Sequence, residues 1–423
     1  MRKVLVITYY WPPAGGPGVQ RWLKFVKYFR DYGIEPIVYI PENPHYPLLD
    51  RTLVDEVPND LTIYRHKIFE PYGISKIISG KKTKRISSGV ISPKNQSILE
   101  RLMLWVRGNL FIPDARKFWI GPSVKFLKKV LEEDHIETII TTGPPHSMHL
   151  IGLELKKRYK LQWVADFRDP WTNIGYHKKL KLTSYAKKRH KKLEENVLNN
   201  ADKIVVTSKT TKQEFEQITS KPLKVITNGY DFTAFKESVL DAKFTISHIG
   251  SMLTGRNPIN LWKVLSELSN EHEDFKQSLQ LNFIGVVGGN ILNSIQKYGL
   301  GEHINVLGYI SHEDAVKYQQ KSQILLLVEI DSQETTGIIP GKLFEYLWAR
   351  RPILGIGPSN WEVAEMVSET ESGDVFGYDA HSELKDVILN WFQAYKNNSL
   401  SVSSTNIKKY SRRDLTRQLA EYI

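Results

Sequence analysis

The sequence contains no cysteine, and none of its apolar runs approaches the roughly 18 residues that a membrane-spanning helix needs. The first absence excludes disulfides, thiolate nucleophiles and zinc sites built on cysteine. The apolar run that ends at Trp11 is too short for the core of a secretory signal. We therefore expect a cytoplasmic protein, with peripheral attachment to the inner face of the cytoplasmic membrane left open.

Internal repeats and low-complexity tracts are also absent, which disfavours solenoids and propellers. Because single hydrophobic cores rarely grow past about 250–300 residues, a chain of 423 residues is expected to form two domains. Apolar runs typical of buried strands alternate with helical patterns, which indicates parallel sheets. The expected strands are KVLVIT, IEPIVYI, ETIITT, QWVADF, KIVVTS and LKVITN, followed by FTISHIG, LNFIGV, HINVLGY, ILLLVEI and RPILGIG.

The strand and helix pattern slackens after Asn228-Gly229 and restarts at Phe244. We therefore predict two Rossmann-like, doubly wound α/β domains, at 1–230 and 231–404. Helices are expected at His312–Lys321 and Lys342–Arg350, among others. A closing amphipathic helix within 405–423 either ends the second domain or crosses back to the first.

The charges are divided unequally between the two predicted domains. Residues 1–230 hold 40 Lys and Arg against 22 Asp and Glu, and the remainder holds 18 against 24. This difference favours an anionic partner for the first domain: a phosphate, a nucleic acid or an acidic membrane. A basic surface that is merely solvated fits the same count.

Residues 74–118 interrupt the strand and helix rhythm of the first domain. The segment begins with a basic stretch, SKIISGKKTKRISSG, for which we expect flexibility. SILERLMLWVRGNLFIPDARKFW then mixes large apolar residues with Arg and Lys. That composition is typical of a helix lying in a membrane interface, and it is equally typical of a helix that packs on a core.

Two glycine-containing loops follow the first strand of each predicted domain. Gly15 and Gly16 allow a ligand to approach the backbone at a helix N-terminus, where anions are favoured. The loop lacks the G-x-G-x-x-G spacing and a P-loop Lys, so a dehydrogenase or NTPase is poorly supported, and a simple tight turn is the alternative. Gly250 and Ser251 begin the second loop, in which Arg256 offers a clamp for a diphosphate or, alternatively, pairs with a surface carboxylate.

The segment PGKLFEYLWARRPIL is the most specific in the chain. Lys342 and Glu345 are three residues apart and share one helix face, with Lys342 near the N-terminus, where it reaches a phosphate. Glu345 is placed to accept ribose hydroxyls. An ordinary i,i+3 ion pair is the alternative.

This segment resembles the donor-site helix of the retaining glycosyltransferases of family 4, of the bacterial polysaccharide-assembly type. The other motifs, including DFRDPW at 166–171 and NGYD at 228–231, occur in the order of that family, over nearly the whole chain. The resemblance implies the GT-B fold, in which two Rossmann-like domains face a central cleft. It implies a nucleotide-sugar donor, retention of configuration and no metal or other cofactor. The donor-binding residues implied or inferred are Gly15, Gly16, Gly250, Ser251, Arg256, Gly337, Ile338, Lys342, Leu343 and Glu345.

One position departs from the family pattern. Many members carry an earlier glutamate, separated by seven residues from the one corresponding to Glu345 in an E-x7-E motif, and here that position is Gly337. Glu334, the hydroxyls of Thr335 and Thr336, or backbone amides at 337–339 are the candidates to bind the sugar instead.

The acceptor is expected on the first domain. Asp166, Arg168 and Asp169 follow the strand QWVADF, at the sheet edge where α/β folds place ligand groups, although an ion-pair network bracing the loop is the alternative. His146 opens a helix directly after ETIITT and is the better placed histidine for an acceptor hydroxyl or phosphate. The expected catalytic residues are therefore His146, Asp166, Arg256 and Lys342.

The function predicted is transfer of a sugar from a UDP- or GDP-sugar to a saccharide or lipid-linked saccharide, with the diphosphate stabilised as it departs. Contact of the first domain with an anionic membrane is a further expectation, and nucleic acid is not expected as a partner. The alternatives are a nucleotide-sugar epimerase of the same fold and a non-catalytic basic protein that binds membranes or nucleic acid.

Overall fold

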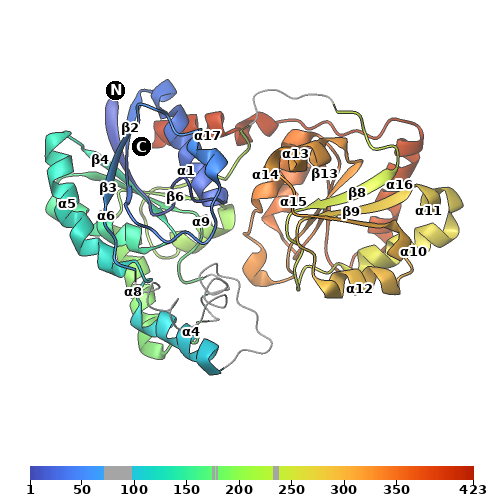
Figure 1. Ribbon diagram of the computed structural model, residues 1–423, viewed down its shortest axis with the longest axis horizontal. Coiled ribbons are helices and arrows are strands. Elements are labelled where there is room, and N and C mark those ends of the chain that lie inside the picture. The colour runs from blue at the N-terminus through green and yellow to red at the C-terminus, as the bar shows by residue number, and fades with distance from the viewer. Residues whose placement is uncertain (71–97, 174–176, 178–179, 232–237) are drawn as a thin grey trace. The chain divides into compact units, whose positions relative to one another are not determined.

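The structure is a computed structural model that describes residues 1–70, 98–173, 177, 180–231 and 238–423. It divides into two compact units (Figure 1). Unit 1 comprises Met1–Asn228 and Arg412–Ile423, and unit 2 comprises Gly229–Ser411. The basic stretch expected to be flexible, at 75–89, lies outside the described residues.

Unit 1 is built on a seven-stranded sheet with the order β3-β2-β1-β4-β5-β6-β7, in which every pairing is parallel. Its strands are β1 (Arg2–Ile7), β2 (Ile34–Pro41), β3 (Thr62–His66), β4 (Thr138–Gly143), β5 (Gln162–Phe167), β6 (Lys203–Val206) and β7 (Leu223–Val225). Its α-helices are α1 (Pro17–Tyr28), α4 (Ile98–Leu110), α5 (Ile120–Glu133), α6 (Ser147–Arg158), α8 (Ser184–Asn200), α9 (Lys209–Glu216) and α17 (Arg412–Tyr422).

Unit 2 repeats this design with a six-stranded parallel sheet in the order β10-β9-β8-β11-β12-β13. Its strands are β8 (Phe244–Ile249), β9 (Leu279–Ile284), β10 (Ile304–Gly308), β11 (Ile324–Val328), β12 (Ile353–Ile356) and β13 (Gly373–Phe376). Its α-helices are α10 (Ile259–Glu271), α11 (Glu273–Ser278), α12 (Gly289–Lys297), α13 (His312–Lys321), α14 (Gly341–Ala349), α15 (Glu362–Glu369) and α16 (Ser382–Lys396).

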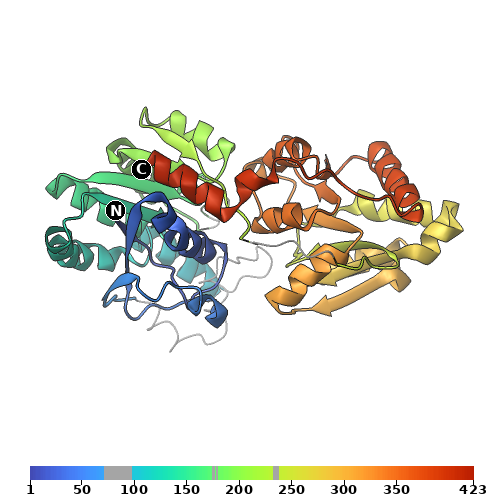
Figure 2. The ribbon, with the colours of Figure 1, turned by 90° about the horizontal axis from the view of Figure 1, so that it is seen from above.

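Each sheet is buried on both faces because successive side chains of a strand point to opposite sides. In β11, Leu326 packs with residues of α10 and α16, whereas Leu325 and Leu327 pack with residues of α14 and α15. The helices accordingly lie on both sides of the sheet, as the view from above shows (Figure 2). The prediction of two doubly wound α/β domains is confirmed.

The last helix belongs to unit 1. Leu415, Leu419 and Ile423 join the same buried cluster as Trp22 and Val26 of α1, and Figure 2 shows α17 beside α1. The chain thus returns to its first domain at Arg412, seven residues later than the expected boundary at 405. The first boundary falls after Asn228, within two residues of the expected 230.

Candidate functional site

In both sheets the strand order reverses between two neighbouring strands, β1 and β4 in unit 1 and β8 and β11 in unit 2. Doubly wound sheets bind ligands at the carboxyl ends of the strands at such a reversal. The loops that follow these four strands contain most of the residues singled out from the sequence.

Lys342 is held by a buried histidine. The Nζ atom of Lys342, in the first turn of α14, lies 3.1 Å from Nε2 of His248, near the end of β8. Nδ1 of His248 lies 3.0 Å from the carbonyl oxygen of Leu326. A carbonyl only accepts, so Nδ1 donates to it, and Nε2 is left to accept from Lys342. Burial, and then the neighbouring Lys342, hold the pKa of His248 well below its ordinary value, so that the ring is neutral.

Lys342 itself is an easily deprotonated lysine. Burial, and then the nearby charge of Arg256, lower the pKa of Lys342 to about 7, while Glu329 and Glu345 oppose this effect. Near neutral pH its amine therefore exchanges between the charged and the neutral form.

Arg256 is oriented by a carboxylate that sequence reasoning missed. Its Nε and Nη2 atoms donate to Oε1 of Glu329 at 3.1 and 2.8 Å, and Nη2 lies 3.1 Å from Oε2. Glu329 directly follows β11 and is 2% exposed, so the partner is a buried carboxylate, not the surface carboxylate considered above. The sequence signal for Glu329 was the presence of a glutamate near the end of the apolar run ILLLVEI.

Gly250 leaves the space that Lys342 occupies. Its φ of 105° lies in the region that favours glycine, and a Cβ atom there would come within 3.0 Å of Nζ of Lys342. Ser251 is exposed beside it. Gly250, Lys342 and Arg256 are thus brought together at the carboxyl ends of β8 and β11.

Glu345 is oriented by α13 and does not form the i,i+3 ion pair with Lys342 that was the alternative. Its Oε1 lies 3.1 Å from Nε2 of His312, and its Oε2 accepts from Nε2 of Gln319 at 2.7 Å. The carboxylate is partly buried and close enough to Lys342 to affect the pKa of that lysine. The contacts with His312 and Gln319 therefore fix the orientation of the Glu345 carboxylate near the Lys342 amine.

The remaining predicted donor residues differ in their positions. The side chain of Leu343 is fully buried in the core, and its N–H donates to the carbonyl of Pro340. The N–H of Ile338 donates to the Thr335 carbonyl, although the side chain of Ile338 is exposed. Gly337 lies between Thr335 and Ile338 in the loop after β11 and is partly buried.

The threonines suggested as substitutes for the missing glutamate are engaged within their own loop. The hydroxyl of Thr335 donates to the carbonyls of Ile330 and Ser332, and that of Thr336 donates to Gln333. Their orientation toward these carbonyls disfavours them as sugar ligands in this conformation. Glu334 is exposed.

In unit 1, Asp166 belongs to a closed, buried network. One carboxylate oxygen accepts from Nη2 of Arg21 at 2.8 Å, and the other accepts from Trp22 and Thr142, each at 2.8 Å. Burial would raise the pKa of Asp166, but Arg21 and these hydrogen bonds hold the pKa below its usual value. Asp166 is 1% exposed and therefore positions the loop after β5, in line with the bracing alternative rather than with acceptor contact.

Arg168 lies against the start of α1. A Cβ atom on Gly18 would come within 1.4 Å of Nη1 of Arg168, so the guanidinium is packed on the first turn of this helix. Its Nε donates to the carbonyl of Gly143 at 3.3 Å, and Nη2 donates to that of Pro144. Gly16, with a φ of 108°, is the N-cap residue of α1, and Gly15 donates its N–H to Leu48.

His146 precedes α6 and is stacked on Trp171, with ring centroids 4.7 Å apart and planes 3° apart. It is 4% exposed, and neither ring nitrogen has a hydrogen-bond partner among the described residues. Burial, and then the neighbouring His149, hold the pKa of His146 well below its ordinary value. His146 is therefore a neutral ring with unused hydrogen-bonding capacity, while Asp169 is exposed on the same loop as Arg168.

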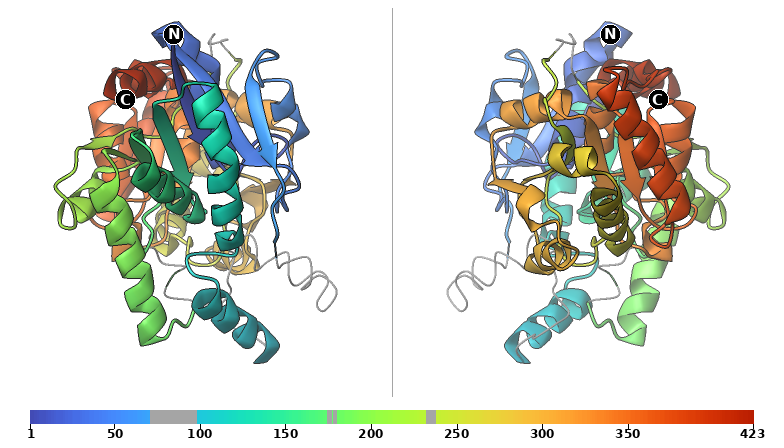
Figure 3. Two further views of the ribbon diagram at one scale, coloured as in Figure 1. Left: turned by 90° about the vertical axis from the view of Figure 1, so that its left-hand side faces the viewer. Right: turned by 90° about the vertical axis from the view of Figure 1, so that its right-hand side faces the viewer.

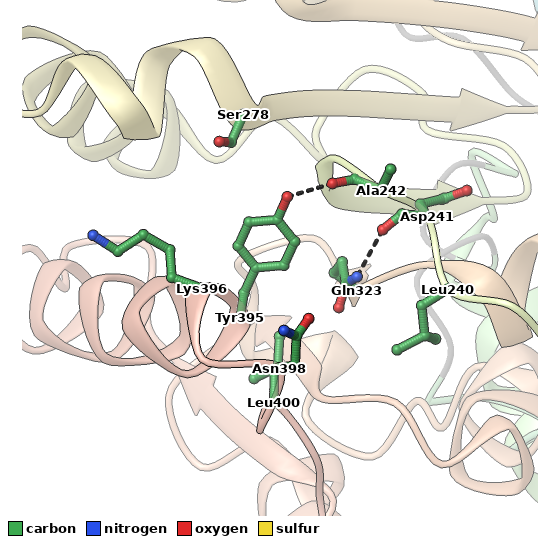
Figure 4. A pocket seen from close by; sticks show the side chains of 9 residues that line it. All are labelled: Leu240, Asp241, Ala242, Ser278, Gln323, Tyr395, Lys396, Asn398 and Leu400. Atoms are coloured by element: carbon green, nitrogen blue, oxygen red, sulfur yellow. Dashed lines mark hydrogen bonds between the residues drawn. The ribbon is translucent and has the colours of Figure 1, made fainter.

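One pocket in the described structure lies away from these residues. A pocket of about 550 Å³ is lined by Asp241, Gln323, Tyr395 and neighbours (Figure 4). Asp241 and Gln323 come just before β8 and β11, so this pocket is at the opposite edge of the sheet from Lys342. In the described residues, no three His, Asp or Glu side chains gather closely enough to hold a metal ion.

Comparisons with known proteins agree with this architecture. The family model described as Glycosyltransferase Family 4 matches residues 84–234. No curated protein matches the sequence. Among solved structures, sucrose-phosphate synthase from Thermosynechococcus elongatus matches with a TM-score of 0.57 at 12% identity, covering 100% of this chain and 98% of that chain.

Two further structures match over essentially their whole length. WaaG, a glycosyltransferase involved in lipopolysaccharide biosynthesis, has a TM-score of 0.55 at 12% identity, with 99% of each chain covered. A TarM variant from S. aureus, in complex with Fondaparinux, alpha-GlcNAc-glycerol and UDP, has a TM-score of 0.57 at 10% identity, covering 100% of this chain and 99% of that chain. The resemblance drawn from the motifs is confirmed: the chain has the two-domain GT-B fold of glycosyltransferases, and its residues 84–234 match Glycosyltransferase Family 4.

Proposed function

We propose that the protein is a retaining glycosyltransferase that moves a sugar from a nucleotide-diphosphate donor to a saccharide or lipid-linked saccharide. The observation that carries this proposal is the convergence of Arg256 and Lys342 at the reversal point of the unit 2 sheet. Two basic side chains at one sheet edge suit a diphosphate, whose charge grows as the bond to the sugar breaks. Glu345, held by His312 and Gln319, is oriented to accept the ribose hydroxyls.

The acceptor is assigned to unit 1. Arg168, packed on the first turn of α1, offers a positive charge, which suits a phosphate of a lipid-linked saccharide. His146 has ring nitrogens to spare for a hydroxyl, and Asp169 is exposed nearby. In this proposal Asp166 acts through the loop that carries Arg168 and does not touch the acceptor.

We also propose that unit 1 contacts an anionic lipid surface through α4. Leu104 of this helix is buried, whereas Leu102, Trp105 and Leu110 are 56%, 39% and 54% exposed. Asn109, near the end of α4, bonds the backbone of Lys181 and Thr183, which lead into α8, and Figure 3 shows the two helices together. Exposed apolar side chains beside lysines suit a membrane interface. The exposed basic residues of α8 are Lys187, Lys188, Arg189, Lys191 and Lys192.

None of the helices in the described ranges is long and apolar enough to span a bilayer. The α4 surface is therefore proposed as a peripheral contact, strengthened by lysine attraction to anionic headgroups. Binding to vesicles of anionic lipid, weakened by salt and by Leu102→Ser with Trp105→Ser, is the expected result. Val239→Ser, at a 93% exposed site of unit 2, is the matched control, and equal binding of all three proteins would contradict the contact.

The donor proposal is tested by calorimetry with UDP-, GDP- and ADP-sugars. One of them is expected to bind, and Lys342→Ala and Glu345→Ala are each expected to weaken that binding at least tenfold, in line with the loss of a charged hydrogen bond. Glu383→Ala, an exposed carboxylate on α16, is the control. Unchanged binding by both site variants would show that the donor lies elsewhere.

The reaction is tested by incubating the protein and the bound donor with and without a membrane extract as the source of acceptor. Sugar transfer that requires the extract, and resists a metal chelator, is expected. Conversion of the donor to its 2-epimer without extract would favour the epimerase of the same fold. Salt-sensitive binding to vesicles or RNA without any sugar-nucleotide binding would favour the non-catalytic alternative.

A further inference from the structure

Lys342 has a neutral partner where a buried cation would ordinarily have a carboxylate. The Nζ atom donates to Nε2 of His248 at 3.1 Å. The buried carboxylate of Glu329, which directly follows β11, instead accepts hydrogen bonds from Arg256 with both of its oxygens. Lys342 is thus held in place by a neutral hydrogen-bond acceptor.

His248 is itself locked. Its Nδ1 donates to the carbonyl of Leu326 in β11, and the ring is 1% exposed. Helix α14 is joined to the same two strands, because Oη of Tyr346 accepts from the N–H of Ile249 at 3.0 Å and approaches the Leu326 carbonyl. The histidine and the helix that carries Lys342 are therefore tied to one point of the sheet.

We propose that His248 positions Lys342 for the donor diphosphate and that binding of this diphosphate draws a proton from solvent onto Lys342. The inference rests on the proposed function, because it takes the diphosphate of a sugar nucleotide as the ligand. In the step, the neutral amine of Lys342 gains one proton and becomes an ammonium ion. No covalent bond of the donor changes.

The charges around Lys342 explain why the proton arrives with the ligand. Burial disfavours the charged amine and Arg256 repels a second cation, while Glu329 and Glu345 offset this only in part, so the pKa of Lys342 is lowered to about 7. His312 faces Glu345, Tyr378 donates to the backbone of Glu329, and the buried His248 stays neutral. A diphosphate adds two negative charges beside Lys342, which favours the ammonium form.

Gly250 leaves room for the Lys342 amine. A side chain at this position would meet Nζ at 3.0 Å, so any larger residue would displace the lysine from His248. The backbone turn at Gly250 also has a φ of 105°, which other residues adopt only with strain. Gly250 therefore belongs to the arrangement that holds Lys342 against His248.

The experiment is calorimetric titration of the whole protein with UDP-glucose and GDP-mannose, whose diphosphates do not titrate near pH 7. HEPES and Tris at pH 7.5 differ in ionisation enthalpy, so the difference in heat gives the number of protons taken up. From a pKa of about 7, we expect uptake of about three quarters of a proton for each nucleotide sugar bound. Affinity is expected to fall as pH rises from 7 to 9, since the free protein must then gain the proton at increasing cost.

Three variants separate positioning from folding. Lys342→Arg keeps a permanent charge, so uptake is expected to vanish while binding persists. His248→Leu removes the acceptor and is expected to move the pH at which affinity begins to fall to lower values, with about tenfold weaker binding at pH 7.5. His248→Gln, whose amide oxygen replaces the accepting nitrogen, is expected to restore most of this loss.

The matched control is His303→Leu. His303 is also buried in unit 2, and its Nδ1 lies 3.2 Å from the carbonyl oxygen of Leu279. It precedes β10, the edge strand, which is separated by β9 from the strand β8 that carries His248. It is expected to leave proton uptake unchanged. Wild-type heats that do not depend on the buffer, or equal uptake by Lys342→Arg, would overturn the inference while leaving the donor site intact. Failure of every nucleotide sugar to bind would overturn the proposed function, and this inference with it.

Discussion

Units 1 and 2 place their candidate residues at equivalent points of similar sheets, yet the two sites differ in how their charges are satisfied. In unit 1 the buried Asp166 has Arg21 as a full ionic partner. In unit 2 the buried His248 gives Lys342 only a neutral acceptor. The sequence holds an excess of 18 basic charges up to residue 230, but Lys342, whose pKa is lowered to about 7, lies in the acidic remainder. Net charge therefore describes a surface and does not locate a reactive group.

The strongest way to break this comparison is to open the closed network. Asp166→Ala leaves Arg21 buried without its partner, which is expected to lower the free energy of unfolding of unit 1 by about 3–5 kcal/mol. Asp169→Ala, at an exposed carboxylate three residues later, is expected to change it by less than about 0.5 kcal/mol. Denaturant unfolding of both variants measures the difference, and similar losses would show that the network has no special weight.

Arg256→Lys tests unit 2 by changing geometry while keeping charge. The guanidinium fork that bonds Glu329 is lost, so the donor diphosphate loses an oriented partner. We expect kcat/KM to fall by about 10²–10³, the loss found when one donor to a developing anion is removed. Lys263→Arg, on the exposed surface of α10, is the control, and unaltered kcat/KM for Arg256→Lys would remove Arg256 from the site.

Acid is expected to weaken unit 1 through its buried histidines. Burial lowers the pKa of His149 to about 3 and that of His177 to about 4. These rings stay neutral in the folded protein while the unfolded chain takes up protons below about pH 6.5, so stability falls as pH falls. Each histidine contributes roughly 2 kcal/mol of this loss between pH 7 and pH 5.

His149→Phe tests that expectation directly. The ring of His149 is stacked on Phe167 at 4.2 Å and bonds Thr141, so the variant keeps the stacking and removes the titration. The difference in unfolding free energy between pH 7 and pH 5 is expected to shrink by about 2 kcal/mol relative to the wild type. His135→Phe, near the surface at the end of α5, serves for comparison, and an unchanged difference in His149→Phe would contradict the assignment.

The smallest expected change in stability comes from His146→Phe. Phenylalanine keeps the stacking on Trp171, and the histidine nitrogens have no partner in the described residues. The free energy of unfolding is therefore expected to change by less than about 1 kcal/mol. If His146 bonds the acceptor, sugar transfer falls by about tenfold or more at equal donor affinity. Full activity would identify His146 as a packing residue only.

Much of the fold was predictable because its strands are buried on both faces. The apolar runs ending at Ile249 and Val328 were recognised, and helix α13 was predicted with its observed bounds, His312–Lys321. Strands β3 and β13 were missed. Both are edge strands whose side chains are mostly half-exposed or exposed, so they lack the continuous apolar run that marks a central strand.

The candidate site was predictable in its loops and not in its partners. Glycine, arginine and lysine after a strand are readable in one dimension, as at Gly250, Arg256 and Lys342. Glu329 lies 73 positions from its partner Arg256, and His248 lies 94 positions from its partner Lys342. Only the parallel pairing of β8 and β11 brings these partners together. Leu343 was predicted as a donor residue, and the structure shows that its side chain, one residue after Lys342 in the helix, is buried in the core.

The return of α17 to unit 1 has a consequence for how the protein is made. Leu415, Leu419 and Ile423 complete a core whose other side chains emerge from the ribosome several hundred residues earlier. During synthesis, the apolar side chains of unit 1 that α17 covers therefore stay uncovered until residues 412–423 are made. Unit 2, Gly229–Ser411, has its whole sequence before then. A nascent chain halted before Arg412 is thus the state in which a chaperone would have the most to protect.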